Sequence, residues 1–164
     1  MRLICNPLAS LVALVFFLSG CAPVPIQYGK ETSIAVWELG DLSPPGSVQS
    51  DLGELLSARI IQTLSEKGEY TVVERDRLVL ALEELRLGTE SFADESTGLR
   101  IGRLVGAQLM VFGGYQVIED KMRLDLRLVE VETGRILKAA QRTTSSSDLS
   151  GWLKAAKEAA DELF

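Results

Sequence analysis

The sequence predicts an α/β fold, in which helices pack on a mixed β-sheet. In the first half of the chain, strand-like segments alternate with segments of helical apolar periodicity, and the order strand, helix, strand predicts a crossover between two parallel strands. From residue 108 onward, three strand-like segments follow one another with short turns, which predicts an antiparallel meander. We therefore expect a β-α-β crossover followed by a three-stranded antiparallel meander.

The first twenty residues have the pattern of a bacterial lipoprotein signal peptide. Arg2 supplies a positive charge, and the apolar run 8–18 is too short to cross a hydrocarbon core of about 30 Å. Ser19 and Gly20 stand directly before Cys21, which resembles the lipobox in which that cysteine is lipidated, with palmitate among its acyl chains, and becomes the mature N-terminus. An ordinary secretory signal and an uncleaved membrane anchor are the alternatives.

Residues 21–31 are expected to form a lipidated tether, and residues 32–164 a single domain. The residue after Cys21 is Ala22 and not Asp, and in this the sequence resembles lipoproteins that are sorted to the outer membrane. Pro23 and Pro25 favour an extended chain, which at about 3.1 Å per residue keeps the domain within roughly 30 Å of the membrane. We expect an outer-membrane lipoprotein whose domain faces the periplasm.

Composition excludes several kinds of function. The chain has 17 Lys and Arg against 23 Asp and Glu, and its basic residues are scattered among acids, which argues against binding to nucleic acid or anionic lipid. It contains no histidine. Because Cys5 would leave with the signal and Cys21 would be lipidated, the usual metal sites and Ser-His or Cys-His pairs are ruled out. No metal and no cofactor is expected.

The β-α-β crossover is predicted within residues 32–74. Residues 32–38 are apolar and β-branched and predict a strand that is buried on both faces, and the turn-forming residues of 39–49 predict a loop. A helix should run from Val48 to a stop at Lys67-Gly68, and 70–74 should be the second strand. The expected inward face of that helix consists of Leu52, Leu55, Leu56, Ile60 and Leu64.

Two further helices are predicted before the meander. The first covers 75–87, ends at Gly88, and has Leu78, Leu82 and Leu85 on one face. The second follows the polar connection 89–96 and covers 97–105, with Gly106 after its end. Its expected inward residues are Leu99, Leu104 and Val105.

The meander consists of strands at 108–118, 121–131 and 135–145. Gly113-Gly114 in the first strand predicts a bulge or a close approach to other backbone. The second strand alternates between Met122, Leu124, Leu126 and Leu128 on one face and Arg123, Asp125 and Arg127 on the other. Asp148 should cap a last helix with an apolar stripe of Leu149, Trp152, Leu153, Ala156, Ala160 and Leu163.

Four segments of the chain resemble the CsgG/HfaB family of curli-type secretion lipoproteins. They are Ile34-Ala35-Val36, the run 70–75 (YTVVER), the run 106–113 (GAQLMVFG) and the run 126–137 (LRLVEVETGRIL). The resemblance implies a CsgG-like periplasmic α/β domain tethered to the outer membrane. It also implies a possible assembly into a ring, because the curli secretion members form a ring that continues into a transmembrane pore.

The resemblance does not extend to the pore. In the pore-forming members, hairpins are inserted near the strand that corresponds to 121–131 and after the last strand. A membrane-spanning hairpin needs about twenty residues and a turn, and the connection at 119–121 is too short for one. After Ser145 the sequence passes directly into the expected last helix. We expect a domain that lacks the pore-forming hairpins.

The favoured function is therefore that of a non-catalytic accessory or assembly factor for secretion, surface appendages or envelope biogenesis, which binds an envelope protein or itself. The anchor would raise its effective concentration for a partner at the membrane. The connection 88–96 and the residues of two other surfaces are candidates for this contact. The first of the two other surfaces consists of the loop residues Asp41, Ser43 and Pro44. The second consists of the strand residues Arg123, Asp125 and Arg127.

Two alternatives belong to other classes. The first is an activator of a peptidoglycan synthase, that is, of a penicillin-binding protein, against which the short tether counts. The second is an enzyme that uses a carboxylate pair. Glu83-Glu84, Asp94-Glu95 and Glu130 with Glu132 are such pairs, but neighbouring acids on one element diverge in direction, so we expect no catalytic activity.

Overall fold

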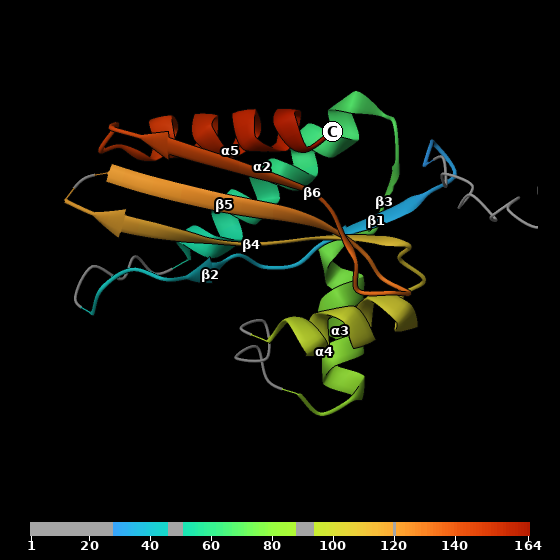
Figure 1. Cartoon of the computed structure of the whole chain (residues 1–164). Coiled ribbons are helices and arrows are strands. Elements are labelled where there is room, and N and C mark those ends of the chain that lie inside the picture. The colour runs from blue at the N-terminus through green and yellow to red at the C-terminus, as the bar shows by residue number, and fades with distance from the viewer. Residues whose placement is uncertain (1–27, 46–50, 88–93, 120) are drawn as a thin grey trace, which may run out of the picture.

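The structure is a computed structural model that describes residues 28–45, 51–87, 94–119 and 121–164. The expected signal peptide, Cys21 and residues 22–27 of the expected tether lie outside these residues, as does most of the connection 88–96. The domain predicted from residue 32 is described except for its gaps, and Figure 1 shows how its helices and strands are arranged.

A mixed sheet forms the centre of the fold. Its strands lie in the order β3-β1-β4-β5-β6, and β1 pairs in parallel with both β3 and β4. β5 pairs antiparallel with both β4 and β6, so the parallel β1–β3 pair confirms the crossover and the antiparallel β4–β5–β6 pairs confirm the meander. The strands are β1 (Ser33–Val36), β3 (Thr71–Val72), β4 (Leu109–Ile118), β5 (Lys121–Glu130) and β6 (Ile136–Thr144).

One strand was not predicted. Residues Gly40–Asp41 form β2, which pairs in parallel with β4 at Gly114 and Tyr115, farther along β4 than the pairing with β1. The sequence predicted a loop here because glycine, proline and serine are concentrated in 39–49. The chain does turn within this segment, but only after it has added two residues to the sheet.

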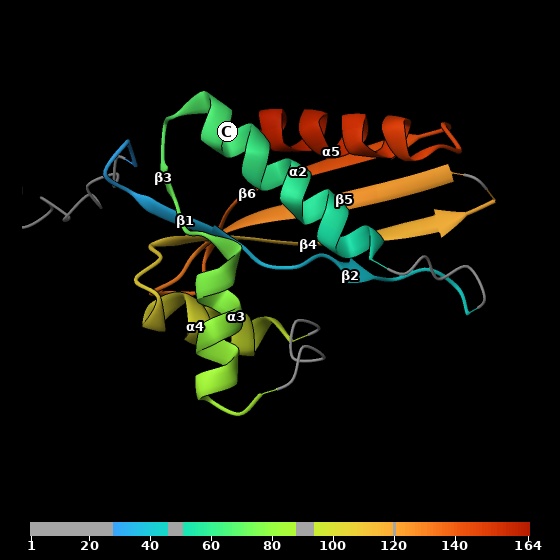
Figure 2. The same ribbon diagram turned by 180° about the vertical axis from the view of Figure 1, so that it is seen from behind.

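The helices form one layer on each face of the sheet. α2 (Leu52–Lys67) and α5 (Leu149–Leu163) cover one face, with α5 against β5 and β6. α3 (Arg75–Glu84) and α4 (Glu95–Leu104) gather on the opposite face, near the end where β1 and β3 lie (Figures 1 and 2). Among the described helices, none covers the far part of the β4–β5–β6 meander on that face.

β1 contributes to both hydrophobic layers, as its composition predicts. Ile34 and Val36 pack toward α2 and α5, whereas Ala35, and Trp37 directly after β1, pack toward α3 and α4. The apolar face of β5 is entirely buried beneath α5 and α2, which confirms the alternation of its sequence. Burial of each such leucine stabilises the fold by roughly 1.5–3 kcal/mol.

The helix ends follow their capping residues. Gly68 and Gly106 have φ angles of 65° and 76°, which confirms them as the residues after the ends of α2 and α4. The carboxylate of Asp148 accepts a hydrogen bond from the amide of Gly151 at 2.7 Å and confirms the predicted cap of α5. α4 begins at Glu95, two residues before the predicted start, because Asp94 caps it. α3 ends at Glu84, three residues before its predicted end, and Gly88 lies outside the described residues.

Three leucines that were expected to be buried are exposed. Leu104 is 60% exposed, because the inward face of α4 consists of Gly98, Ile101 and Gly102 instead. A Cβ atom at Gly102 would lie 2.5 Å from Met110 Sδ, so the missing side chain lets α4 approach the sheet closely. Leu55 and Leu149 are each 43% exposed, although both belong to the predicted apolar stripes of α2 and α5.

Candidate partner-binding surface

The part of the meander that α3 and α4 leave uncovered presents polar side chains. Across its three strands, Arg123 pairs with Gln116 and Thr143, Asp125 with Gly114 and Gln141, and Arg127 with Phe112 and Ala139. Since residues that pair directly point to the same face, these side chains form one surface. We call it the open sheet face and define it as Gln116, Arg123, Asp125, Arg127, Ala139, Gln141 and Thr143.

Arg123 and Asp125 form a two-pronged ion pair on this surface. Arg123 Nε donates to Asp125 Oδ2 at 2.8 Å, and Arg123 Nη2 donates to Asp125 Oδ1 at 2.9 Å. Arg123 Nη2 also donates to Gln141 Oε1 on β6 at 3.3 Å. Both charged side chains are about half exposed, so the pair adds little stability. Its consequence is that the guanidinium and the carboxylate have fixed directions on the open sheet face.

Arg127 connects the open sheet face to the helix layer beside it. Its guanidinium donates to Glu95, the first residue of α4. Asp94, directly before Glu95, accepts from the amides of Ser96 and Thr97, both at 3.1 Å. Hydrogen bonds from the hydroxyl groups of Thr97 and Ser96 are the main cause of a pKa of about 2 for Asp94. α4 therefore begins at a defined place next to Arg127.

β2 and the residues after it lie along β4. The amide of Leu42 donates to the carbonyl of Tyr115 at 2.8 Å, and the amide of Val117 donates to Ser43 Oγ at 3.0 Å. Asp41 Oδ1 accepts from the amide of Ser43 at 2.8 Å, which closes a local turn. Asp41 and Ser43 thus have structural roles at the edge of β4, while Pro44 is exposed just beyond them.

Glycines in β4 allow two neighbours to lie close to it, the residues after β2 at Gly114 and the backbone of β5 at Gly113. A Cβ at Gly114 would be 2.9 Å from Leu42 Cδ1, and one at Gly113 would be 2.3 Å from the carbonyl oxygen of Asp125. The sequence predicted a bulge or a close approach at this pair, and the structure shows the close approach. Burial, and then the charge of Asp41, raise the pKa of Tyr115.

A hollow of about 300 Å³ lies where β2, the open sheet face and the start of α4 meet. Asp125 and Arg127 line it together with Leu42 and Glu95, above a floor that includes Phe112. Of the six residues predicted for partner binding, the structure thus brings Asp125 and Arg127 to one site. Arg123 lies elsewhere on β5, and Asp41 in β2 and Ser43 and Pro44 after it do not line the hollow.

The sequence did not identify Glu95 or Gln141 as members of this surface. Glu95 was considered as part of the connection 88–96 and as half of a carboxylate pair, but nothing in the sequence indicates that the start of α4 reaches β5. Gln141 could have been found from the meander itself, since the short turn at 132–134 limits the register that places it beside Asp125.

The carboxylate pairs considered for catalysis have other partners or diverge. Asp94 caps α4, while its neighbour Glu95 binds Arg127. Glu130 and Glu132 line one hollow, but Glu130 already accepts from Thr133 and from Tyr28 Oη, the latter at 2.6 Å, and these contacts lower its pKa. A carboxyl group with a lowered pKa remains ionised and is a poor general acid.

The described parts of the chain contain neither a cluster of metal ligands nor a membrane-spanning helix. No group of three His, Cys, Asp or Glu side chains there is arranged to hold a metal ion. None of the described helices combines the length and the apolar character that crossing a bilayer requires.

Comparison with known proteins identifies a family. The sequence pattern of the family described as curli production assembly/transport component CsgG matches residues 27–117, which run from before β1 to the last residue but one of β4. No protein among the curated sequences matches this chain.

Solved structures share the fold at low sequence identity. The C-terminal domain of LpoB from Salmonella enterica is 21% identical, with a TM-score of 0.60 over 82% of this chain and 93% of that domain. Lipoprotein GNA1162 from Neisseria meningitidis is 17% identical, with a TM-score of 0.58 over 69% of this chain and 79% of that chain. A PelC dodecamer from Paraburkholderia phytofirmans is 14% identical, with a TM-score of 0.52 over 82% and 86%. These likenesses show a common fold.

Proposed function

The chain belongs to the family of the curli production assembly/transport component CsgG, and from this premise we propose that it is a lipid-anchored accessory factor of the cell envelope. Cys21 would be lipidated and residues 22–31 would tether the domain to the outer membrane, on its periplasmic side. The domain would act without catalysis, by binding an envelope protein during secretion, appendage assembly or envelope biogenesis. It would have no pore of its own.

The observation that supports a binding role most strongly is the open sheet face. Three adjacent strands present fixed charges and exposed polar groups beside a hollow, on a face that α3 and α4 cover only in part. An antiparallel sheet can leave one face in water without a partner. The hollow adds an apolar contact to these charges, because Leu42 on its lining is 65% exposed and lies in the same hollow as the ion pair of Arg127 and Glu95.

The short connection between β4 and β5 supports the absence of a pore. The two strands pair up to Ile118 with Lys121, which leaves only Glu119 and Asp120 between them. This is the first place at which the pore-forming members insert a hairpin, and about twenty residues would be needed there.

Photocrosslinking in cells tests the proposed function. A photoreactive amino acid is placed at Ala139 or Thr143, both exposed on the open sheet face, and at Glu69, an exposed control in the turn after α2. We expect an envelope protein to be captured from the open sheet face and not from the control position.

The identity of the captured protein separates the alternatives. Capture of a penicillin-binding protein at the inner membrane would favour the activator of peptidoglycan synthesis over an outer-membrane assembly role. If both face positions capture no more protein than Glu69 does, the open sheet face is not the binding surface.

A further inference from the structure

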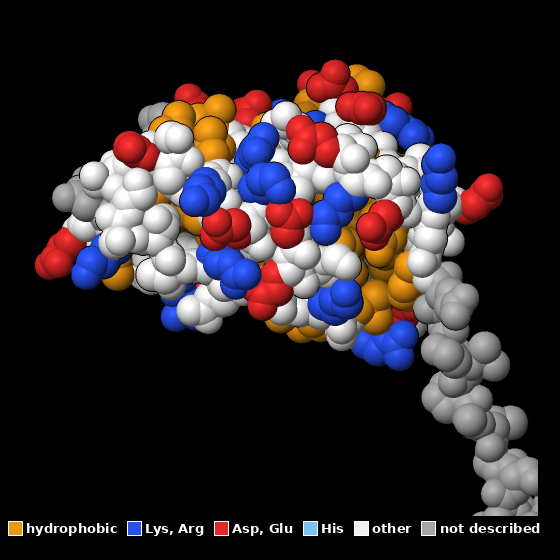
Figure 3. All heavy atoms as spheres, turned by 90° about the horizontal axis from the view of Figure 1, so that it is seen from above, with side chains coloured by type: hydrophobic (Ala, Val, Ile, Leu, Met, Phe, Trp, Pro, Cys, Tyr) orange, Lys and Arg blue, Asp and Glu red, His pale blue; other side chains and the backbone are white. Residues whose placement is uncertain are grey.

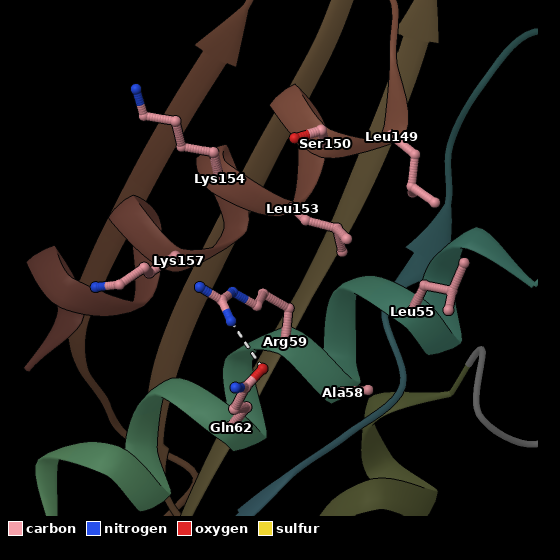
Figure 4. A pocket seen from close by; sticks show the side chains of 9 residues that line it. All are labelled: Leu55, Ala58, Arg59, Gln62, Leu149, Ser150, Leu153, Lys154 and Lys157. Atoms are coloured by element: carbon pink, nitrogen blue, oxygen red, sulfur yellow. Dashed lines mark hydrogen bonds between the residues drawn. The ribbon is translucent and has the colours of Figure 1, made fainter.

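A second surface lies on the opposite side of the sheet, between α2 and α5. A groove of about 650 Å³ runs between these helices, and it contains two of the leucines that the apolar stripes predicted to be buried, Leu55 and Leu149. Leu153 joins them, so that the apolar side chains gather toward one end of the groove (Figure 4). Such apolar surface is expected to be covered by another molecule in an assembly.

The charged residues of this groove all have one sign. Arg59, Lys154 and Lys157 line it, and none of its nine described lining residues is an acid. The chain as a whole has more acidic than basic residues, so the positive charge of this groove is opposite to the net charge of the chain. The sequence had shown basic residues scattered among acids, and it is the packing of α2 against α5 that brings these three together. Figure 3 shows basic side chains beside an exposed apolar patch over these helices.

Two of these cations are available to a partner. Arg59 donates to the neutral amide oxygen of Gln62 at 2.7 Å and forms no ion pair within the described part of the chain. Lys154 approaches Glu158 only to 3.9 Å and its side chain is 77% exposed. Lys157 is paired with Asp161 at 2.6 Å.

The complement of this groove is found on the same chain, on α3. Leu80 is 57% exposed, and Asp76, Glu83 and Glu84 surround it at spacings of three and four residues, so all four share one side of the helix. These three acids form no ion pair with any described residue. We call these four residues the acidic stripe.

We propose that the α2–α5 groove binds the acidic stripe of a second copy of this chain. Leu80 would enter the groove between Leu55 and Leu153, and the acids beside it would meet Arg59 and Lys154. Opposite charges on the two surfaces make the contact specific, because two basic grooves would repel each other and so would two acidic stripes. α2 and α3 lie on opposite faces of the sheet, so the contact is head-to-tail and leaves both surfaces free at the ends of a dimer (Figure 1).

One helix in one groove buries less than the roughly 1,200 Å² of a stable interface, so covalent capture is the appropriate measurement. Full-length protein in detergent micelles is given two cysteines, Ala58→Cys in the groove and Leu80→Cys in the stripe, and is then oxidised. We expect a disulfide ladder of dimers, trimers and larger species, because a head-to-tail contact repeats. The two single-cysteine variants measure any disulfide that forms through Cys21. The matched control is Ala58→Cys with Thr143→Cys, because Thr143 lies outside the acidic stripe.

Charge reversal tests the recognition itself. Arg59→Glu with Lys154→Glu, or Glu83→Lys with Glu84→Lys, should each reduce the ladder about tenfold, and all four reversals in one chain should restore it. A missing ladder, a ladder equal to that of the control pair, or a ladder unaffected by either reversal would overturn the proposal. It is also overturned if the groove binds vesicles of phosphatidylglycerol while no ladder forms, since the cations then serve an anionic membrane.

Discussion

Gly53 determines how closely α2 approaches the segment that leads into β2, and replacing it with alanine should destabilise the domain. A Cβ atom at position 53 would lie 2.4 Å from the carbonyl oxygen of Leu39, well inside van der Waals contact. The obstacle is backbone and not a flexible side chain. The hydroxyl group of Ser57 holds Leu39 against α2, because it accepts a hydrogen bond from the amide of Leu39 at 3.0 Å and donates one to the carbonyl of Gly53 at 2.7 Å.

Two opposing effects decide the magnitude. Alanine favours a helix over glycine by about 1 kcal/mol, and less at this position in its first turn. Forcing an extra methyl group into a packed site costs about 1–3 kcal/mol, and here it also strains two hydrogen bonds of Ser57. We expect the free energy of unfolding to fall by about 1–2 kcal/mol, which for a domain of this size lowers Tm by roughly 3–8 °C.

Thermal unfolding followed by circular dichroism measures this effect, with Gly40→Ala as the control. Gly40 lies in β2, and a Cβ there would meet nothing within 4 Å, so the Tm of the Gly40→Ala protein should change little. A Gly53→Ala protein that is as stable as the unchanged protein, or more stable, would refute the close approach of α2 to Leu39.

Three further predictions follow from the fold and the site. Ile60 is fully buried between α2 and the sheet, so Ile60→Ala should lower the free energy of unfolding by about 2–5 kcal/mol in urea titrations, whereas Gln62→Ala at an exposed site should not. Because the pKa of Asp94 is lowered to about 2, its ionised form stabilises the folded state above pH 4, and this contribution is lost as the pH falls toward 2. The difference in urea midpoint between the unchanged protein and Asp94→Asn should therefore shrink over that range, and a constant difference would contradict the assignment. In planar bilayers the protein should not raise ion conductance, and reproducible channels would show that the proposal of a domain without a pore is wrong.

Periodicity predicted the elements of the fold because most of them bury one clear face. The alternation of β5 and the stripes of α2 and α5 each follow from local sequence and a single layer of contacts. β2 could not be predicted in this way, since two residues have no period and their pairing depends on Gly114, which is distant in sequence. The prediction of the inward face of α4 was also wrong, because small glycines rather than large leucines face the sheet.

The candidate surfaces were predictable only in part. Arg123, Asp125 and Arg127 share a face through the period of a strand, and the structure confirms this arrangement. The partner of Arg127 is Glu95, 32 residues away, and that contact depends on how α4 packs against the sheet. The α2–α5 groove likewise joins Arg59 to Lys154 across nearly a hundred residues, so a scan of local charge could not find it.

The proposed function depends on lipidation of Cys21, and mass spectrometry of the N-terminus of the mature protein tests this proposal most directly. We expect a mature protein that begins at a diacylated or triacylated Cys21 and is found in the outer-membrane fraction, and a Cys21→Ala variant that leaves the membrane or fails to mature. A mature chain with an unmodified Cys21, or a Cys21→Ala protein that remains in the outer membrane, would contradict it.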